Sequence, residues 1–178
     1  MDFSKLRQFQ LSTDTDIKPF KCSDEDLNEF LLEDAKHFQK ELMAVTYLLE
    51  DMEQHKTAAY FSLLADKITF NPEERSRWNR LNRNIPNSKR RRSYPAVKVG
   101  RLAVSKDFTS QGLGTFILDN IKYAFSNVKR LGCRFITVDA LSSAVTFYER
   151  NGFQFFTEQD KYDETRLMFF DLKNFISD

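Results

Sequence analysis

The segment 97–128 constrains the fold most, because its pattern changes from that of a strand to that of a helix at two closely spaced glycines. Val97, Val99, Leu102 and Val104 predict a strand, and a polar link over 105–111 follows it. Gly112-Leu113-Gly114 then opens a stretch, 112–128, whose apolar side chains recur at helical spacing. A strand joined to a helix in this way predicts an α/β protein, with a turn at which the backbone can approach a ligand.

The glycine turn has two interpretations. The first N–H groups of a helix lack intrahelical acceptors, so they attract phosphate groups, and glycines let a ligand come close. The alternative is a tight turn with no ligand. The turn lacks the Gly-Lys-Ser/Thr of a Walker loop, and it lacks the third glycine of the dinucleotide-binding fingerprint. Any anion site here is therefore of another kind.

The rest of the chain predicts a mixed sheet with helices. Ser23 is the expected N-cap of an amphipathic helix, and Ser142 is the expected cap of a short helix over 142–149. Leu131-Gly132 is expected to end the long helix. A second helix is expected over 35–43, and strands are expected over 3–11, 44–49, 57–64, 133–140, 152–156 and 165–172. The order predicts an α/β fold.

Composition narrows the class of protein. The chain has 178 residues and a formal net charge of +1, which fits one domain over 1–178 without a general attraction to polyanions. Cys22 and Cys133 are expected to be buried thiols, while His37 and His55 are isolated and show no metal spacing. Neither a signal peptide nor a membrane span is expected, so we predict a cytoplasmic protein without a metal.

A basic segment over 71–95 interrupts this regular pattern. It is expected to form a short helix and a loop, and it contains two acids and eight cations: Arg75, Arg77, Arg80, Arg83, Lys89, Arg90, Arg91 and Arg92. One interpretation is an arm that contacts nucleic-acid phosphates, with Trp78 stacked on a base. The other is a solvated surface with Trp78 packed on the protein body.

Two separated motifs resemble the GNAT N-acetyltransferases. Gly100-Arg101-Leu102-Ala103-Val104 followed by Gly112-Leu113-Gly114 resembles their acyl-CoA-binding segment. Val138-Asp139-Ala140 and the run Phe147-Tyr148-Glu149-Arg150-Asn151-Gly152-Phe153 resemble their closing motif. The segments 20–31, 39–40 and 46–49 resemble the branch that contains aminoacyl-tRNA-acetylating toxins. The resemblance covers roughly 17–172 with a gap at the basic segment, and it implies a GNAT-like, mostly antiparallel sheet flanked by helices.

The resemblance implies acetyl-CoA as the acyl donor. The backbone of Leu102, Ala103 and Val104 would pair with the pantetheine arm like an added strand. The pyrophosphate would lie at the helix start, on Thr109, Ser110, Gln111, Gly112, Leu113, Gly114 and Thr115. Thr109 stands where the family has Gln or Arg, which predicts weaker binding of CoA, with Gln111 as a substitute.

Tyr148 is the catalytic residue that the resemblance implies. At this position the family uses a tyrosine to protonate the departing CoA thiolate, and a phenol with a pKa near 10 carries its proton at neutral pH. The alternative is a tyrosine that only packs. Asp139, Glu41 and Glu149 are candidates for the general base. Because Cys133 is expected in a buried strand, we expect direct transfer without a thiol relay.

The acceptor has several interpretations. The favoured acceptor is the α-amine of an aminoacyl-tRNA, contacted by the eight cations of 71–95, and such a toxin would pair with a ribbon-helix-helix antitoxin. The alternatives are a small-molecule or protein amine, or a non-catalytic acyl-CoA-binding module. A homodimer through an exposed sheet edge or through the strand Leu167-Met168-Phe169-Phe170 is also considered.

Overall fold

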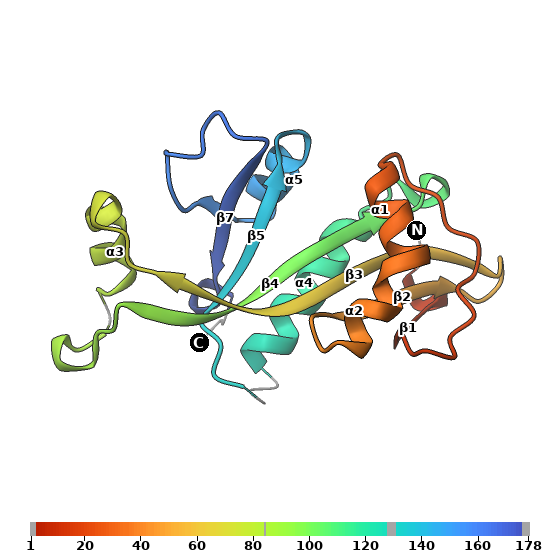
Figure 1. Cartoon of the computed structure of the whole chain (residues 1–178), viewed down its shortest axis with the longest axis horizontal. Helices are drawn as coiled ribbons and strands as arrows, with labels where there is room; N and C mark the ends of the chain where they lie inside the picture. Colours follow the sequence, from red (N-terminus) through yellow and green to blue (C-terminus); the bar gives the residue numbers. More distant parts are fainter. Residues whose placement is uncertain (1–2, 84, 128–130, 176–178) are drawn as a thin grey trace. The chain divides into compact units, whose positions relative to one another are not determined.

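The computed structural model describes residues 3–83, 85–127 and 131–175, which form one seven-stranded sheet with helices (Figure 1). The strand order is β1-β2-β3-β4-β5-β7-β6. The strands are β1 (Leu6–Gln10), β2 (Val45–Asp51), β3 (Lys56–Thr69), β4 (Ser93–Val104), β5 (Phe135–Leu141), β6 (Gln154–Phe155) and β7 (Thr165–Asp171). The α-helices are α1 (Glu25–Glu29), α2 (Ala35–Lys40), α3 (Arg75–Leu81), α4 (Leu113–Asn127) and α5 (Val145–Arg150).

The pairing of the strands confirms a mixed, mostly antiparallel α/β sheet. β1 with β2, β2 with β3, and β7 with both β5 and β6 are antiparallel. Backbone bonds from Ser105 N to Ala58 O (2.9 Å) and from Phe70 N to Arg92 O (2.7 Å) join the opposite ends of β3 and β4, as in an antiparallel pair. β4 and β5 are parallel, with Ala96 opposite Phe135 and Lys98 opposite Thr137.

Contacts divide the chain into two compact units, which we describe separately. Unit 1 comprises 1–64 and 99–121, and unit 2 comprises 65–98 and 122–178. β3, β4 and α4 each contribute residues to both units. The single domain over 1–178 stays a prediction.

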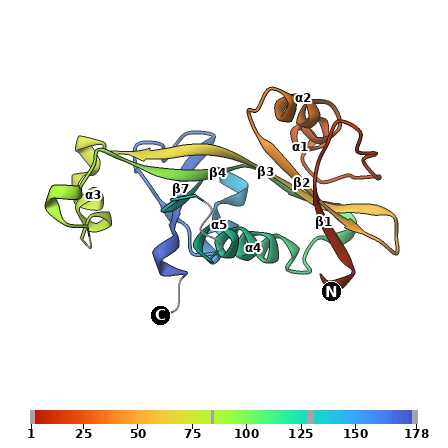
Figure 2. The same ribbon diagram turned by 90° about the horizontal axis from the view of Figure 1, so that it is seen from below.

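Unit 1 is built on the expected hairpin of β2 and β3, with Val45 opposite Leu63 and Asp51 opposite Lys56. The strands are longer than the apolar runs that predicted them. Figure 2 shows α1 and α2 on one face of these strands and the start of α4 on the other. The core of this unit includes the fully buried Leu31, Leu48 and Tyr60. The hydrophobic effect of burying these side chains fixes the helices on the sheet.

The first helical region differs from its prediction at its start and at its centre. Asp24, not Ser23, is the N-cap, because its carboxylate accepts the Leu27 N–H at 3.3 Å. Two expected helices are one continuous helical stretch, in which a π-helical turn (Phe30–Asp34) joins α1 to α2. The stretch ends at Lys40 rather than Met43, since Leu42 has a left-handed φ of 58°.

Unit 2 contains the parallel pair and the last strands. The aromatic strand 167–170 is part of β7, which lies between β5 and β6, so it is not a sheet edge. Met168, Phe169 and Phe170 are also buried. The idea that this strand supports a dimer as a free surface is therefore wrong. β5 begins at Phe135 rather than Cys133, and Cys133 is only half-buried.

The helices at the other motifs also differ from their predictions in detail. Ser142 lies inside a 3-10 turn (Ser142–Ala144) ahead of α5, and its hydroxyl donates to Glu164 O, so it does not cap the helix. α4 begins at Leu113 rather than Gly112 and is described to Asn127, and the expected last residue, Val128, lies outside the described residues. No helix within the described ranges is long and apolar enough to cross a membrane.

Candidate active site

The glycine turn lies in unit 1 between the end of β4 and the start of α4. A 3-10 turn (Lys106–Phe108) follows the strand, with Phe108 buried beneath it. Ser110 and Gly112 then adopt left-handed backbone conformations, with φ of 61° and 82°. Left-handed residues reverse the chain over a short distance, which lets α4 begin at once. Gly112 is the position where a residue without Cβ is needed, because its conformation is strained for other residues.

The first turn of α4 can hold an anion. Its first described backbone bond runs from Phe116 N to Gly112 O at 3.0 Å, so the N–H groups of Leu113, Gly114 and Thr115 precede the helical ladder. A Cβ at Gly112 would meet only the Phe3 ring, at 4.0 Å. Such N–H groups at a helix start attract anions.

The polar side chains of the turn are engaged with its own backbone. The Thr109 hydroxyl donates to Lys106 O at 3.0 Å, and the Gln111 amide donates to Asp107 O at 3.2 Å. These bonds stabilise the turn, and both side chains are exposed. Sequence reasoning missed Phe3, whose ring stacks on Phe116 with centroids 4.5 Å apart. No sequence signal linked the amino terminus to this helix.

Tyr148 lies in α5 of unit 2 and is 6% exposed. Its ring packs edge-on against Phe147 and Phe153, with centroids 5.1 and 5.3 Å away. Burial raises the pKa of the phenol above its ordinary value, because an apolar environment disfavours the phenolate. The hydroxyl therefore keeps its proton throughout the neutral range, as a proton donor requires.

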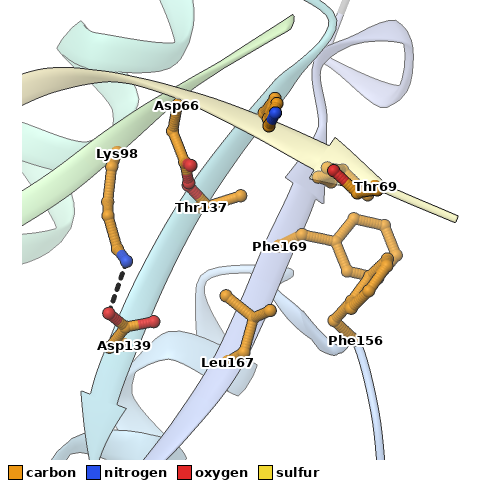
Figure 3. Close-up of a pocket in the computed structure, with 10 residues that line it drawn as sticks. Asp66, Thr69, Lys98, Thr137, Asp139, Phe156, Leu167 and Phe169 are labelled. Carbon is orange, nitrogen blue, oxygen red and sulfur yellow. Dashed lines mark hydrogen bonds and ion pairs between the residues drawn. The ribbon is translucent and has the colours of Figure 1, made fainter. Parts of the chain in front are cut away.

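A cavity of about 260 Å³ opens in unit 2 on one face of the strands (Figure 3). One side is polar: Lys98 pairs with Asp139, and the Thr137 hydroxyl donates to Asp66. The other side is apolar. The lining comprises Asp66, Lys67, Ile68, Thr69, Lys98, Thr137, Asp139, Phe156, Leu167 and Phe169.

Only one of the three candidates for the general base lines the cavity. Asp139 lines it, whereas Glu41 and Glu149 are exposed at or near the ends of α2 and α5. Sequence reasoning did not single out Asp66 or Lys98. Their signal was a charged residue at an alternating position within an apolar strand, which is weak, because such residues usually face water.

The basic segment is partly structured around Trp78. The indole is buried and lies near Phe70 and Tyr94, which settles the alternatives for Trp78 in favour of packing. Arg77 is half-buried, with ion pairs to Glu74 (3.7 Å) and Glu158 (3.8 Å). The other seven cations are exposed: Arg75, Arg80, Arg83, Lys89, Arg90, Arg91 and Arg92.

The cysteines do not form a reactive site. Cys22 is buried and Cys133 half-buried, and burial raises the pKa of both thiols, which disfavours the nucleophilic thiolate. Across the described residues, no three His, Cys, Asp or Glu side chains are grouped to hold a metal ion.

Part of the sequence matches a known domain family. Residues 83–155 match the family model of the acetyltransferase (GNAT) domain. This range contains the glycine turn and Tyr148. No curated protein matches the sequence.

Solved structures with the same fold include a bacterial toxin and the proteins AtaT and KacT. A crystal structure of a bacterial toxin has a TM-score of 0.78 at 14% identity, covering 95% of this chain and 92% of that chain. AtaT complexed with acetyl-methionyl-tRNAfMet has a TM-score of 0.77 at 22% identity, covering 96% of both chains. A Tyr-to-Phe mutant of KacT has a TM-score of 0.75 at 24% identity, also covering 96% of both chains.

Proposed function

We propose that this chain, which carries a GNAT acetyltransferase domain and has acetyl-CoA as its acyl donor, acetylates the α-amine of an aminoacyl-tRNA. Acyl transfer from acetyl-CoA is the reaction of the domain family. Our proposal concerns the acceptor of the acetyl group. An N-acetylated aminoacyl-tRNA cannot form the next peptide bond through its amine, so the proposed activity is that of a toxin.

The exposed cations of the basic segment carry the proposal for tRNA. The net charge is only +1, so the attraction to a polyanion must be local. Arg90, Arg91 and Arg92 follow one another on an exposed segment, and the nearby α3 is anchored by its buried Trp78. Lys and Arg side chains on an anchored surface contact phosphates without reading sequence. AtaT, which shares the fold, has been solved with acetyl-methionyl-tRNAfMet.

The donor site that we assign consists of the end of β4 and the start of α4. Backbone groups of Leu102, Ala103 and Val104 would hold the pantetheine arm, and the segment from Thr109 to Thr115 would hold the pyrophosphate. The donor, when bound, supplies an acetyl group activated as a thioester. The domain then needs only to orient the amine and supply a proton, because no covalent enzyme intermediate is required.

In the proposed reaction, Tyr148 is the proton donor for the leaving sulfur. A C–N bond forms between the amine nitrogen and the acetyl carbon, the C–S bond breaks, and the electron pair of that bond stays on sulfur. Tyr148 donates its phenolic proton to this sulfur, and the proton that the amine loses goes to Asp139 or to water. The tyrosine then recovers a proton from solvent. Tyr148 carries its proton at neutral pH, as a donor must, while burial raises its pKa and makes the phenol a weaker acid than a solvated one.

A small-molecule amine is the second candidate acceptor, and the cavity in unit 2 supports it. Its volume of about 260 Å³ is smaller than that of a typical drug site, so it suits a group of about amino-acid size. In this case the basic segment would be dispensable for activity.

We also propose that an antitoxin of the ribbon-helix-helix class neutralises the chain. Support comes from AtaT, which has been solved bound to the carboxy terminus of the antitoxin AtaR at 20% identity to this chain. Co-expression with the product of the adjacent gene, followed by co-purification, tests this partner. A toxic chain whose toxicity no adjacent gene relieves would contradict it.

The acceptor is tested with purified protein, radiolabelled acetyl-CoA and total charged tRNA. Deacylated tRNA and free amino acids serve as controls. We expect label on charged tRNA alone, and less label as salt rises, because phosphate contacts are screened. Label on free amines but not on tRNA would contradict the tRNA acceptor and favour a small-molecule substrate.

A further inference from the structure

Asp66 lines the cavity of unit 2, and the mechanism above does not use it. It lies in β3, opposite the apolar side of the cavity in Figure 3. The described partner of its carboxylate is the hydroxyl of Thr137, a neutral group. A carboxylate has about four lone-pair sites, so Asp66 retains capacity for further hydrogen bonds.

The other three charged side chains of the cavity have an oppositely charged partner or are exposed to solvent. Lys98 and Asp139 pair with each other on adjacent strands, so their charges balance. The Lys98 side chain is 23% exposed and that of Asp139 47% exposed, which leaves the pair accessible from the cavity. Lys67 is an exposed residue. Asp66 is therefore an anionic side chain whose described partner is neutral, and it lies opposite the apolar side of the cavity.

The apolar side is formed by residues that follow β5 in the chain. Phe156 and Phe169 are buried, with ring centroids 6.0 Å apart in an edge-on arrangement. Leu167 is half-buried beside them. Such a wall favours apolar groups, because contact with it removes their surface from water. A carboxylate facing an apolar wall suits a ligand that combines a cation with an apolar group.

We propose that this cavity binds the amine substrate, with its ammonium group on Asp66 and its apolar side chain against Leu167, Phe156 and Phe169. The bound ammonium group loses one proton to solvent before the neutral amine attacks the thioester. This inference rests on the proposed function and names the class of acceptor: an α-ammonium compound with an apolar side chain of amino-acid size.

The apolar side of the cavity disfavours acidic acceptors. A carboxylate side chain would lie against Leu167, Phe156 and Phe169, where it would lose its hydration without gaining a hydrogen-bond donor. We therefore expect the aspartyl ester to be a much poorer substrate than the leucyl ester, although both carry the same α-amine.

The test uses amino-acid methyl esters, which carry the amine and side chain of the acceptor without nucleic acid. Asp66→Asn keeps the shape of the side chain and removes its charge. We expect kcat/KM for leucine methyl ester to fall about 10- to 100-fold, mostly through KM, since a charge-assisted hydrogen bond is lost. Asp163→Asn, at an exposed position of unit 2, is the matched control and should leave kcat/KM unchanged.

A second variant and a second measurement keep the outcomes distinct. Leu167→Ala should shift the substrate preference from leucine methyl ester toward phenylalanine methyl ester, because it enlarges the cavity at its apolar side. Calorimetric binding of leucine methyl ester should weaken in Asp66→Asn in parallel with KM, which needs no turnover. An active wild type with unchanged binding and kinetics in Asp66→Asn, or one that prefers the aspartate ester, would overturn the cavity assignment. Ester binding that depends on Asp66, without acetyl transfer to any amine, would instead overturn the proposed function.

Discussion

The indole of Trp78 stacks on the ring of Tyr94 with centroids 5.4 Å apart and planes inclined by 26°. The Tyr94 hydroxyl donates to the Asn82 side chain, and the Asn82 amide donates to Trp78 O at 2.8 Å. One aromatic pair and one buried amide thus connect α3 to the first part of β4. The basic residues on and after α3 therefore belong to a segment that Trp78, Asn82 and Tyr94 hold in place.

Replacing Trp78 should destabilise the fold of unit 2. Trp78→Ala removes a side chain that is 8% exposed, and we expect a loss of about 3–5 kcal/mol in the free energy of unfolding. Trp78→Phe should lose less, because a ring remains against Tyr94. Urea denaturation followed by circular dichroism measures both. A Trp78→Ala protein as stable as wild type would show that the indole is not part of the core.

Neutralising three consecutive cations should weaken tRNA binding without affecting a small acceptor. For Arg90→Gln/Arg91→Gln/Arg92→Gln we expect the slope of log K against log salt to become shallower by roughly two to three. The rate with leucine methyl ester should stay the same. A control variant with Arg7, Lys21 and Lys40 changed to Gln, all exposed in unit 1, tests whether any loss of charge suffices. Equal slopes in the two variants would contradict a localised tRNA site.

The left-handed glycine of the turn should affect both stability and donor binding. Gly112→Ala places a Cβ on a residue with φ of 82°, so we expect a loss of about 1–2 kcal/mol. We also expect KM for acetyl-CoA to rise, because the turn must shift. Gly132→Ala is the control, since a Cβ there meets nothing within 4 Å. A Gly112→Ala protein with an unchanged KM for acetyl-CoA would separate this turn from the donor site.

Stability should fall in alkali because of two buried tyrosines. Burial raises the pKa of Tyr60 and of Tyr148 above the ordinary value near 10, so the unfolded chain releases these protons first. The stabilisation is complete below pH 10 and is lost as pH rises further, by about 1.4 kcal/mol per pH unit for each tyrosine. Urea titrations above pH 10 measure this slope. Tyr148→Phe should make it shallower, whereas Tyr162→Phe, at a 90% exposed position, should not.

The sequence predicted the elements whose pattern is local. The strand, turn and helix around Gly112-Leu113-Gly114 were expected from spacing, and so was the hairpin of β2 and β3. The resemblance of the motifs to one family anticipated the mixed sheet. Cap positions were less accurate, because Ser23 and Asp24 are both good caps and tertiary contacts decide between them.

The cavity could not be predicted, because it depends on contacts between distant parts of the chain. Asp66 and Thr137 are 71 positions apart, and only the order of the strands brings them together. The pairing of Lys98 with Asp139 likewise depends on the parallel register of β4 and β5. The burial of Trp78 depends on Tyr94, which the sequence analysis placed at the end of a loop. A single sequence contains no direct signal for such pairs.

The proton donor is tested by removing one oxygen atom. Tyr148→Phe keeps the packing against Phe147 and Phe153, so the protein should stay folded and bind acetyl-CoA. We expect kcat to fall by about 100-fold or more, the usual contribution of a general acid. Tyr162→Phe should have the activity of wild type. Unchanged turnover in Tyr148→Phe would leave this tyrosine with a packing role alone.

The most direct test of the account locates the transferred acetyl group by mass spectrometry. Charged tRNA is incubated with the protein and acetyl-CoA, the ester is hydrolysed, and the released amino acids are analysed. The account predicts amino acids acetylated on the α-amine, enriched in those with apolar side chains, from wild type and far fewer from Tyr148→Phe. Amino acids without an acetyl group, or an acetyl group on the RNA itself, would contradict it.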